Sequence, residues 1–201
     1  MNSKFQFNTK PETTEGKKRS LTDMVFIFVI SAMLGWVVEV GYVFLVVGKF
    51  VSRGMIYGPF CTIYGFGALI LYFLFYNVKP TKANIPYTFI TAAFVMGAFE
   101  LVCGLGFKYI FGIEMWNYHG QFLEILNYTT VPILIGWGVL GTIYVFFLQP
   151  LLLKVISWLP KGIEKRLAII IVVFYVLNVG LSFFNIHFNP EILYKLVDPT
   201  L

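Results

Sequence analysis

The sequence predicts an all-α fold, a polytopic membrane protein built as a bundle of five transmembrane helices. Hydrophobic residues make up 58% of the 201 residues and charged residues only 12%, against roughly 45–50% and about 25% in soluble domains. Five apolar runs approach the ~20 residues that a helix needs to cross about 30 Å of hydrocarbon. The polar/apolar alternation that a transmembrane barrel requires is absent. The composition therefore indicates that the bilayer is the solvent of this chain.

Two parts are predicted, a basic cytoplasmic tail at residues 1–23 and a transmembrane helical domain at residues 24–201. The first apolar run exceeds the ~7–15-residue core of a secretory signal peptide, and no A-x-A-like cleavage site follows it. We interpret it as an uncleaved signal anchor that also forms the first span. The five predicted spans cover residues 24–48, 59–78, 86–111, 131–153 and 166–185.

The second span is the least regular of the five. Gly58-Pro59 opens it, with proline at a position that the first turn of a helix tolerates. The glycine-rich stretch Tyr64-Gly65-Phe66-Gly67 leaves open a broken or re-entrant helix. Such a break is tolerated in a membrane only where protein or water covers the backbone.

The distribution of basic residues predicts the orientation. With the N-terminus in the cytoplasm, the tail and residues 79–85 and 154–166 hold five, two and four Lys and Arg, eleven in all. The outer segments hold three, and Lys108 lies inside the third span. Because cytoplasmic loops carry the excess of Lys and Arg, the sequence favours N-in and C-out.

Several classes of function are excluded or disfavoured. The net charge of +5 resides mostly in the tail and loops, where membrane orientation explains it without a nucleic-acid partner. The two cysteines lie inside apolar runs and give no disulfide framework or metal-ligand spacing. The phosphate-loop, H-E-x-x-H and G-x-S-x-G motifs are absent. We therefore expect no enzyme activity, no cofactor and no metal, and no ATP binding by the chain itself in the P-loop manner.

Two acidic residues, Glu39 and Glu100, lie well inside the first and third predicted spans. A carboxylate at the bilayer centre costs about 2.5–3.5 kcal/mol, so it needs a partner or a function. Both lie a few ångströms to the outer side of the midplane, on helices that run in the same direction, and could share one layer of the bundle. They would then form a proton or cation site, or an anchor for a cationic ligand. The alternative is a structural acid, hydrogen-bonded to Tyr, Trp or Asn, or paired with Lys108 or Arg53.

Other residues near these acids complete the predicted site. Tyr42 shares the helix face of Glu39, and Arg53-Gly54 indicates a tight turn that could reach Glu39, Glu114 or a lipid headgroup. Lys108 lies two turns outward of Glu100 and is expected to extend to the interface. The candidate ligand-binding residues are Glu39, Glu100, Arg53, Trp36, Tyr42 and Tyr64.

Polar and aromatic residues elsewhere have simpler explanations. The Trp and Tyr residues of the outer loop 112–130 belong either to an interfacial aromatic belt or to a ligand-binding cap. Asn178 in the fifth span is expected to form an interhelical hydrogen bond.

A family resemblance rests on residues 35–42 (GWVVEVGY) and 48–67 (GKFVSRGMIYGPFCTIYGFG). They resemble the signature of the bacterial membrane family of ABC-transporter type IV, the CmpB family, approximately G-W-x-x-E-x-x-Y and Y-G-P-F-C-P-I-Y-G-F-G. Phe99-Glu100, Trp116-Asn117-Tyr118 and Trp137-Gly138 resemble its later elements. Ser52, Thr62 and Asn117 depart from the family's usual Asn, Pro and Asp. The resemblance implies a multi-pass protein of the bacterial plasma membrane and a transporter permease subunit.

The function expected from these observations is a permease-like component of a transport system with an intramembrane acidic site. It would need a separate ATPase subunit or an ion gradient. Because five helices are few for a transporter, a homodimer or another membrane protein is an expected partner beside the lipid bilayer. The alternative is a non-transporting membrane binding or regulatory subunit of an envelope complex.

Overall fold

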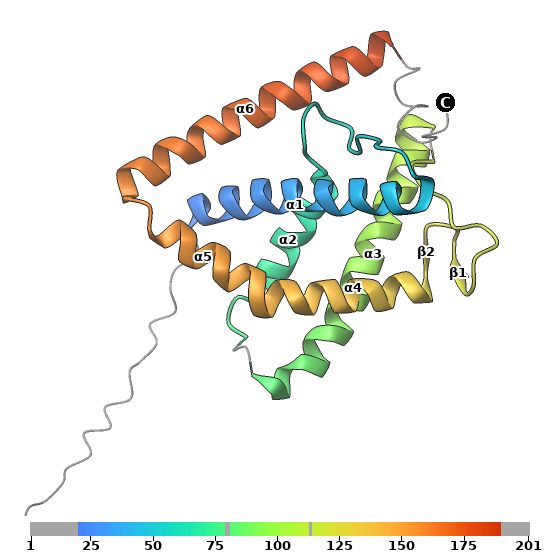
Figure 1. Cartoon of the computed structure of the whole chain (residues 1–201), viewed down its shortest axis with the longest axis horizontal. Coiled ribbons are helices and arrows are strands. Elements are labelled where there is room, and N and C mark those ends of the chain that lie inside the picture. Colours follow the sequence, from blue (N-terminus) through green and yellow to red (C-terminus); the bar gives the residue numbers. More distant parts are fainter. Residues whose placement is uncertain (1–19, 79–80, 113, 190–201) are drawn as a thin grey trace, which may run out of the picture.

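The fold is all-α, as predicted. A computed structural model describes residues 20–78, 81–112 and 114–189, so most of the predicted tail lies outside the described residues. Figure 1 shows the elements in order: α1 (Leu21–Val47), α2 (Thr62–Phe75), the 3-10 turn η1 (Lys82–Asn84), α3 (Ile85–Phe111), the short strands β1 (Glu124–Ile125) and β2 (Thr129–Thr130), α4 (Val131–Ile143), the π-helical segment η2 (Tyr144–Leu148), α5 (Gln149–Ser157) and α6 (Lys161–Phe188).

Four helices in the described part of the chain are long and apolar enough to cross a membrane. They are Leu21–Leu45, Lys82–Phe111, Val131–Ser157 and Lys161–Ile186. The predicted span at 59–78 contains α2, whose 14 residues extend about 21 Å at 1.5 Å per residue. This helix is too short to cross about 30 Å of hydrocarbon alone. The count of five spans is therefore not confirmed by helix length.

Residues 131–157 form one apolar helix with a local irregularity. The π-helical turn η2 immediately precedes α5, which carries Pro150 in its first turn. Proline has no N–H to donate to the preceding turn and its ring crowds that turn, so a locally widened backbone accommodates it. The helix thereby continues through the proline.

Small residues allow α3 and α4 to approach closely. A Cβ atom at Gly141 would lie 2.5 Å from the Cβ of Ala92, and one at Gly97 would lie 1.9 Å from Leu134. Such contacts are the usual way in which membrane helices pack without a hydrophobic driving force between them. This pair forms one side of the bundle, and α1 with α2 forms the other.

One hydrophobic core joins the ends of several helices. It includes Phe26 and Ile27 of α1, Phe75 of α2, Ile156 of α5 and Ala168 of α6. These residues lie near the start of α1 and α6 and near the end of α2 and α5. The helices therefore alternate in direction, and those ends gather on one side of the bundle (Figure 1).

The connection between α1 and α2 enters the interior of the bundle. The backbone N–H of Cys61 donates to the carbonyl of Ala32, near the middle of α1, at 2.9 Å. Ile56 and Phe60 are buried against Val29 and Ala32. The segment 49–61, termed the inserted segment below, thus leads back to mid-helix depth, where α2 begins. The glycine-rich stretch Tyr64-Gly65-Phe66-Gly67, where the sequence left open a broken or re-entrant helix, lies within the unbroken helix α2.

Polar side chains of α6 hold the inserted segment in place. Tyr57 donates its backbone N–H to Ser182 at 3.0 Å, and its carbonyl accepts from Asn178 at 2.6 Å. Its hydroxyl accepts from Asn185. In a membrane interior no water satisfies an irregular backbone, so these side chains supply the missing partners. Asn178 therefore bonds to backbone, and not to another helix as predicted.

We predict that Asn178→Ala lowers the free energy of unfolding in detergent by about 1–3 kcal/mol, because it removes the buried amide that donates to the Tyr57 carbonyl. Chemical or thermal unfolding of the purified protein measures this change. The matched control is Leu177→Ala, since Leu177 is 61% exposed. Equal loss of stability in both variants would contradict the proposed anchoring.

Candidate functional site in the acidic layer

Glu39 of α1 meets groups from two other parts of the chain. Its Oε1 accepts a 2.8 Å hydrogen bond from the hydroxyl of Tyr64, in the first turn of α2. Its Oε2 lies 4.0 Å from Nε of Arg53, and the two side chains are 30% and 19% exposed. The positive end of the α2 dipole lies at the same level and favours a carboxylate. Glu39 thus joins α1, the inserted segment and α2.

Two glycines make this arrangement possible. A Cβ atom at Gly35 would lie 2.2 Å from Cγ of Tyr64, so the missing side chain provides the space for the tyrosine ring. Gly54 has φ of 107°, and a Cβ there would lie 2.2 Å from the carbonyl oxygen of Phe60. The positive φ disfavours any other residue at position 54, and the carbonyl of Phe60 leaves no room for a side chain there. Gly54 therefore sets the turn that carries Arg53 to Glu39.

Glu100 of α3 is the most enclosed of the candidate residues, with 6% exposure. Trp137 of α4 donates its indole N–H to Oε2 at 3.1 Å, and Tyr118 of the outer loop donates its hydroxyl to Oε1 at 3.2 Å. Neutral donors on both oxygens reduce the cost of burying the carboxyl group. The site therefore includes Trp137 and Tyr118, which were not among the predicted ligand-binding residues.

The two acids belong to one connected layer. The rings of Tyr64 and Trp137 lie 5.7 Å apart between centroids, and each ring carries a donor to one of the acids. The structure thus brings together Glu39, Glu100, Arg53 and Tyr64. We call these four residues with Trp137 and Tyr118 the acidic layer.

Two predicted site residues, Trp36 and Tyr42, lie at the margin of the acidic layer. Trp36 donates its indole N–H to Ser52 at 3.3 Å and meets the ring of Phe50 edge-on, so it contacts the inserted segment and not the acids. Tyr42 is 65% exposed. The structure therefore places neither residue among the direct contacts of the acids.

The outer loop folds over the end of α3. Glu114 accepts hydrogen bonds from Lys108 at 2.8 Å, Asn117 at 2.6 Å and the Tyr128 hydroxyl at 2.9 Å. These bonds, led by the one from Lys108, lower the pKa of Glu114 to about 2. Trp116 also donates to the Tyr128 carbonyl at 3.0 Å. Lys108 thus points outward, as expected, and pairs with Glu114.

The outer loop also contacts the acidic layer. It carries Tyr118 down to Glu100. Burial, and then the nearby charge of Glu100, raise the pKa of Tyr118 well above its usual value. The phenol therefore stays protonated and acts as a donor. The sequence contained a signal for this contact in Trp116-Asn117-Tyr118, but only the fold reveals its partner.

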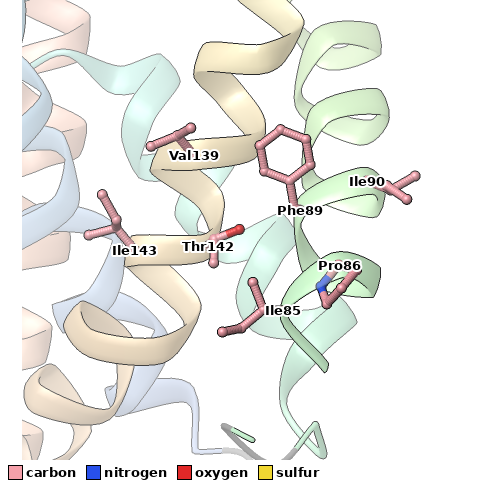
Figure 2. A pocket seen from close by; sticks show the side chains of 7 residues that line it. All are labelled: Ile85, Pro86, Phe89, Ile90, Val139, Thr142 and Ile143. Carbon is pink, nitrogen blue, oxygen red and sulfur yellow. The ribbon is translucent and has the colours of Figure 1, made fainter. Parts of the chain in front are cut away.

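Two hollows adjoin α4. The first, a groove of about 500 Å³ beside α3, is lined by apolar side chains such as Phe89, Ile90 and Val139 (Figure 2). Its Thr142 hydroxyl donates to the Gly138 carbonyl at 2.7 Å. The groove thus offers no free polar group and suits lipid chains. The second, about 160 Å³, is lined in part by Tyr64 and Trp137 and is therefore continuous with the acidic layer.

Metal binding finds no support in the described ranges 20–78, 81–112 and 114–189. They contain no group of three or more His, Cys, Asp or Glu side chains that could hold a metal ion. The side chains of the acidic layer can form hydrogen bonds and ion pairs and can bind a proton or a cation.

Gly35→Ala is predicted to destabilise the protein by about 1–3 kcal/mol, because the added methyl overlaps the Tyr64 ring and forces it away from Glu39. Gly41→Ala on the same helix is the matched control, since a Cβ there meets nothing within 4 Å. That control should be neutral or slightly stabilising, by up to about 1 kcal/mol. Unfolding in detergent measures both variants, and equal effects would refute the steric role of Gly35.

Comparison with known proteins identifies a family. The family model described as "Putative ABC-transporter type IV" matches residues 26–183, a range that contains the whole acidic layer. No curated protein and no solved structure matches the chain. With its membrane-capable helices and a family match over most of its length, the chain belongs to the ABC-transporter type IV family.

Proposed function

We propose that this protein is a permease-like membrane component of a transport system and that the acidic layer binds the transported solute or a coupling proton. The observation that carries the proposal is the connection of Glu39 to Glu100 through Tyr64 and Trp137 inside a membrane-embedded bundle. Ionisable residues at this depth are costly and typically belong to substrate or proton pathways. Family membership supports the same assignment.

The contacts of the two acids suit reversible binding. Glu100 has neutral donors on both oxygens, so gaining a cation or proton does not require breaking an ion pair there. Glu39 has a long 4.0 Å contact with Arg53, which an incoming cation can replace. Because Arg53 lies on the inserted segment and that segment is bonded to α6, movement of α6 would withdraw Arg53 from the site.

Energy must come from elsewhere, since the sequence contains no P-loop motif. A separate ATPase subunit or an ion gradient would supply it. A homodimer, or a complex with another membrane protein, would provide the additional helices of a complete pathway. The chain itself would catalyse no reaction.

We propose an N-in, C-out topology in the bacterial plasma membrane with five crossings. The second crossing combines the inserted segment with α2, which returns from mid-helix depth to the side where α1 began. Thr22 of α1 also donates a hydrogen bond to Glu164 of α6, so the beginnings of these helices lie together. The segments richest in Lys and Arg belong to that side, as the positive-inside rule requires.

The topology predicts the behaviour of reporter fusions. Alkaline phosphatase fused after Leu201 should be active, because it folds only outside the cytoplasm, and a green fluorescent protein at the same place should be dark. Fusions after Ser157, between α5 and α6, should give the reverse result. Fluorescence from the fusion after Leu201 would overturn the proposed orientation.

A non-transporting binding or regulatory subunit remains the second candidate, and one observation favours it. The tip of the outer loop exposes Phe122, Leu123 and Leu126 by 76%, 55% and 65%. An apolar, aromatic tip held by a folded loop suits contact with another envelope protein.

The transport proposal is tested in a strain that lacks the chromosomal copy and receives the wild-type gene or a variant. Mass spectrometry of cell contents and medium should reveal solutes whose distribution depends on the wild-type protein. Glu39→Gln and Glu100→Gln together should abolish that difference at equal membrane levels of protein. Leu177→Gln on the exposed face of α6 is the control for adding an amide. A wild-type solute profile in the double variant would end the proposal.

A further inference from the structure

The cavity inward of Tyr64 and Trp137 has an opening toward the lipid. It occupies about 160 Å³ between α1, α2 and α4, and its lining is almost wholly apolar. Its rim is formed by two residues of α1, Leu34 and Val38, and two residues of α4, Leu140 and Ile143. These four residues are 40% to 50% exposed. The cavity therefore opens sideways between α1 and α4, where acyl chains surround the protein.

Two buried hydroxyl groups line the inner end of this cavity. Ser31 and Tyr144 are only 5% and 7% exposed and lie next to each other. The two hydroxyls interact with each other, and neither has a further partner among the residues that the structure describes. Each keeps unused hydrogen-bonding capacity in a lining that is otherwise apolar. An occupant with a hydrogen-bonding group at this end would use that capacity.

The outer end of the cavity has the opposite chemical character. Tyr64 and Trp137 form its wall there, and each ring is hydrogen-bonded to a carboxyl group behind it. Aromatic faces attract cations, and the carboxyl groups of Glu39 and Glu100 lie behind the two rings, outside the lining of the cavity. This end therefore selects a positively charged group.

We infer that the ligand of the proposed transport site is a small amphipathic organic cation that enters from the bilayer between α1 and α4. The inference rests on the proposed function and names its substrate class. The cationic group lies against Tyr64 and Trp137, and the apolar body lies along the cavity toward Ser31 and Tyr144.

The dimensions limit the size of this ligand. Trp137 and Tyr144 are seven residues apart on a continuous helix, which corresponds to about 10 Å. The cavity is smaller than the roughly 300–1,000 Å³ of sites for drug-sized molecules. An aliphatic amine of about six carbons, with a hydrogen-bonding group at its far end, has the required length and polarity.

Binding to the purified protein in lipid nanodiscs tests the inference. Isothermal titration calorimetry at pH 7 compares 6-amino-1-hexanol, hexylamine, methylamine, 1-hexanol and hexanoate. The amino alcohol should bind most tightly and hexylamine next, while methylamine lacks the apolar body and the other two lack the positive charge. Saturable binding of hexanol or hexanoate as tight as that of hexylamine would overturn the inference.

Variants then locate the binding site. Glu39→Gln should weaken hexylamine binding about tenfold or more, because it removes the negative charge behind the Tyr64 ring against which the cation lies. Leu140→Trp should block the opening without changing the acids, and it keeps the test valid if Glu39→Gln fails to fold. Its control is Leu177→Trp on α6, where the leucine is 61% exposed against 44% for Leu140. Ser31→Ala should reduce the preference for 6-amino-1-hexanol over hexylamine. Equal binding in the two tryptophan variants would place the ligand elsewhere.

The outcome is separable from that of the transport experiment. Solute redistribution that depends on both acids, without amine binding, would refute the ligand class and leave the permease role intact. Amine binding that depends on Glu39 and Leu140, without any solute redistribution, would support the ligand class and refute transport.

Discussion

The arrangement of this bundle depends on partners for two carboxyl groups that the membrane does not solvate. Glu39 receives its contacts from the inserted segment and α2, and Glu100 receives its contacts from α4 and the outer loop. Each donor fixes the rotation or depth of the element that carries it. Apolar packing between membrane helices does not by itself select one arrangement, because lipid competes for the same surfaces. The polar contacts therefore specify one arrangement among several that would bury similar areas.

The same constraint governs the backbone of the inserted segment. Its irregular conformation would be unacceptable against acyl chains, yet Ala32, Asn178 and Ser182 supply partners from both neighbouring helices. Glycine at position 54 permits the turn, and the neighbouring arginine reaches the acid as a consequence. The contacts that satisfy the irregular backbone of the inserted segment thus also place Arg53 in the candidate site.

The sequence predicted the features that hydropathy and charge determine. These include the helical class and the burial of Glu100, whereas the Glu39 side chain is 30% exposed. The length of α2 could not be predicted from the sequence. Residues 59–78 contain no charged residue, and hydropathy does not distinguish helical backbone from loop backbone. Trp137 was noticed only as part of a family motif, since its contact with Glu100 joins residues 37 positions apart. Likewise, Asn178 was recognisable as a polar residue that needs a partner, but its partner is 121 positions away.

The anchoring of Tyr57 by α6 has a consequence for biosynthesis. The ribosome completes α6 more than a hundred residues after Tyr57 has emerged. Until α6 is inserted, the irregular stretch near Tyr57 lacks its side-chain partners, and Arg53 lacks the support of that anchored segment beside Glu39. A nascent chain that ends before residue 178 therefore exposes an incomplete centre to the membrane, and insertion of α6 completes it.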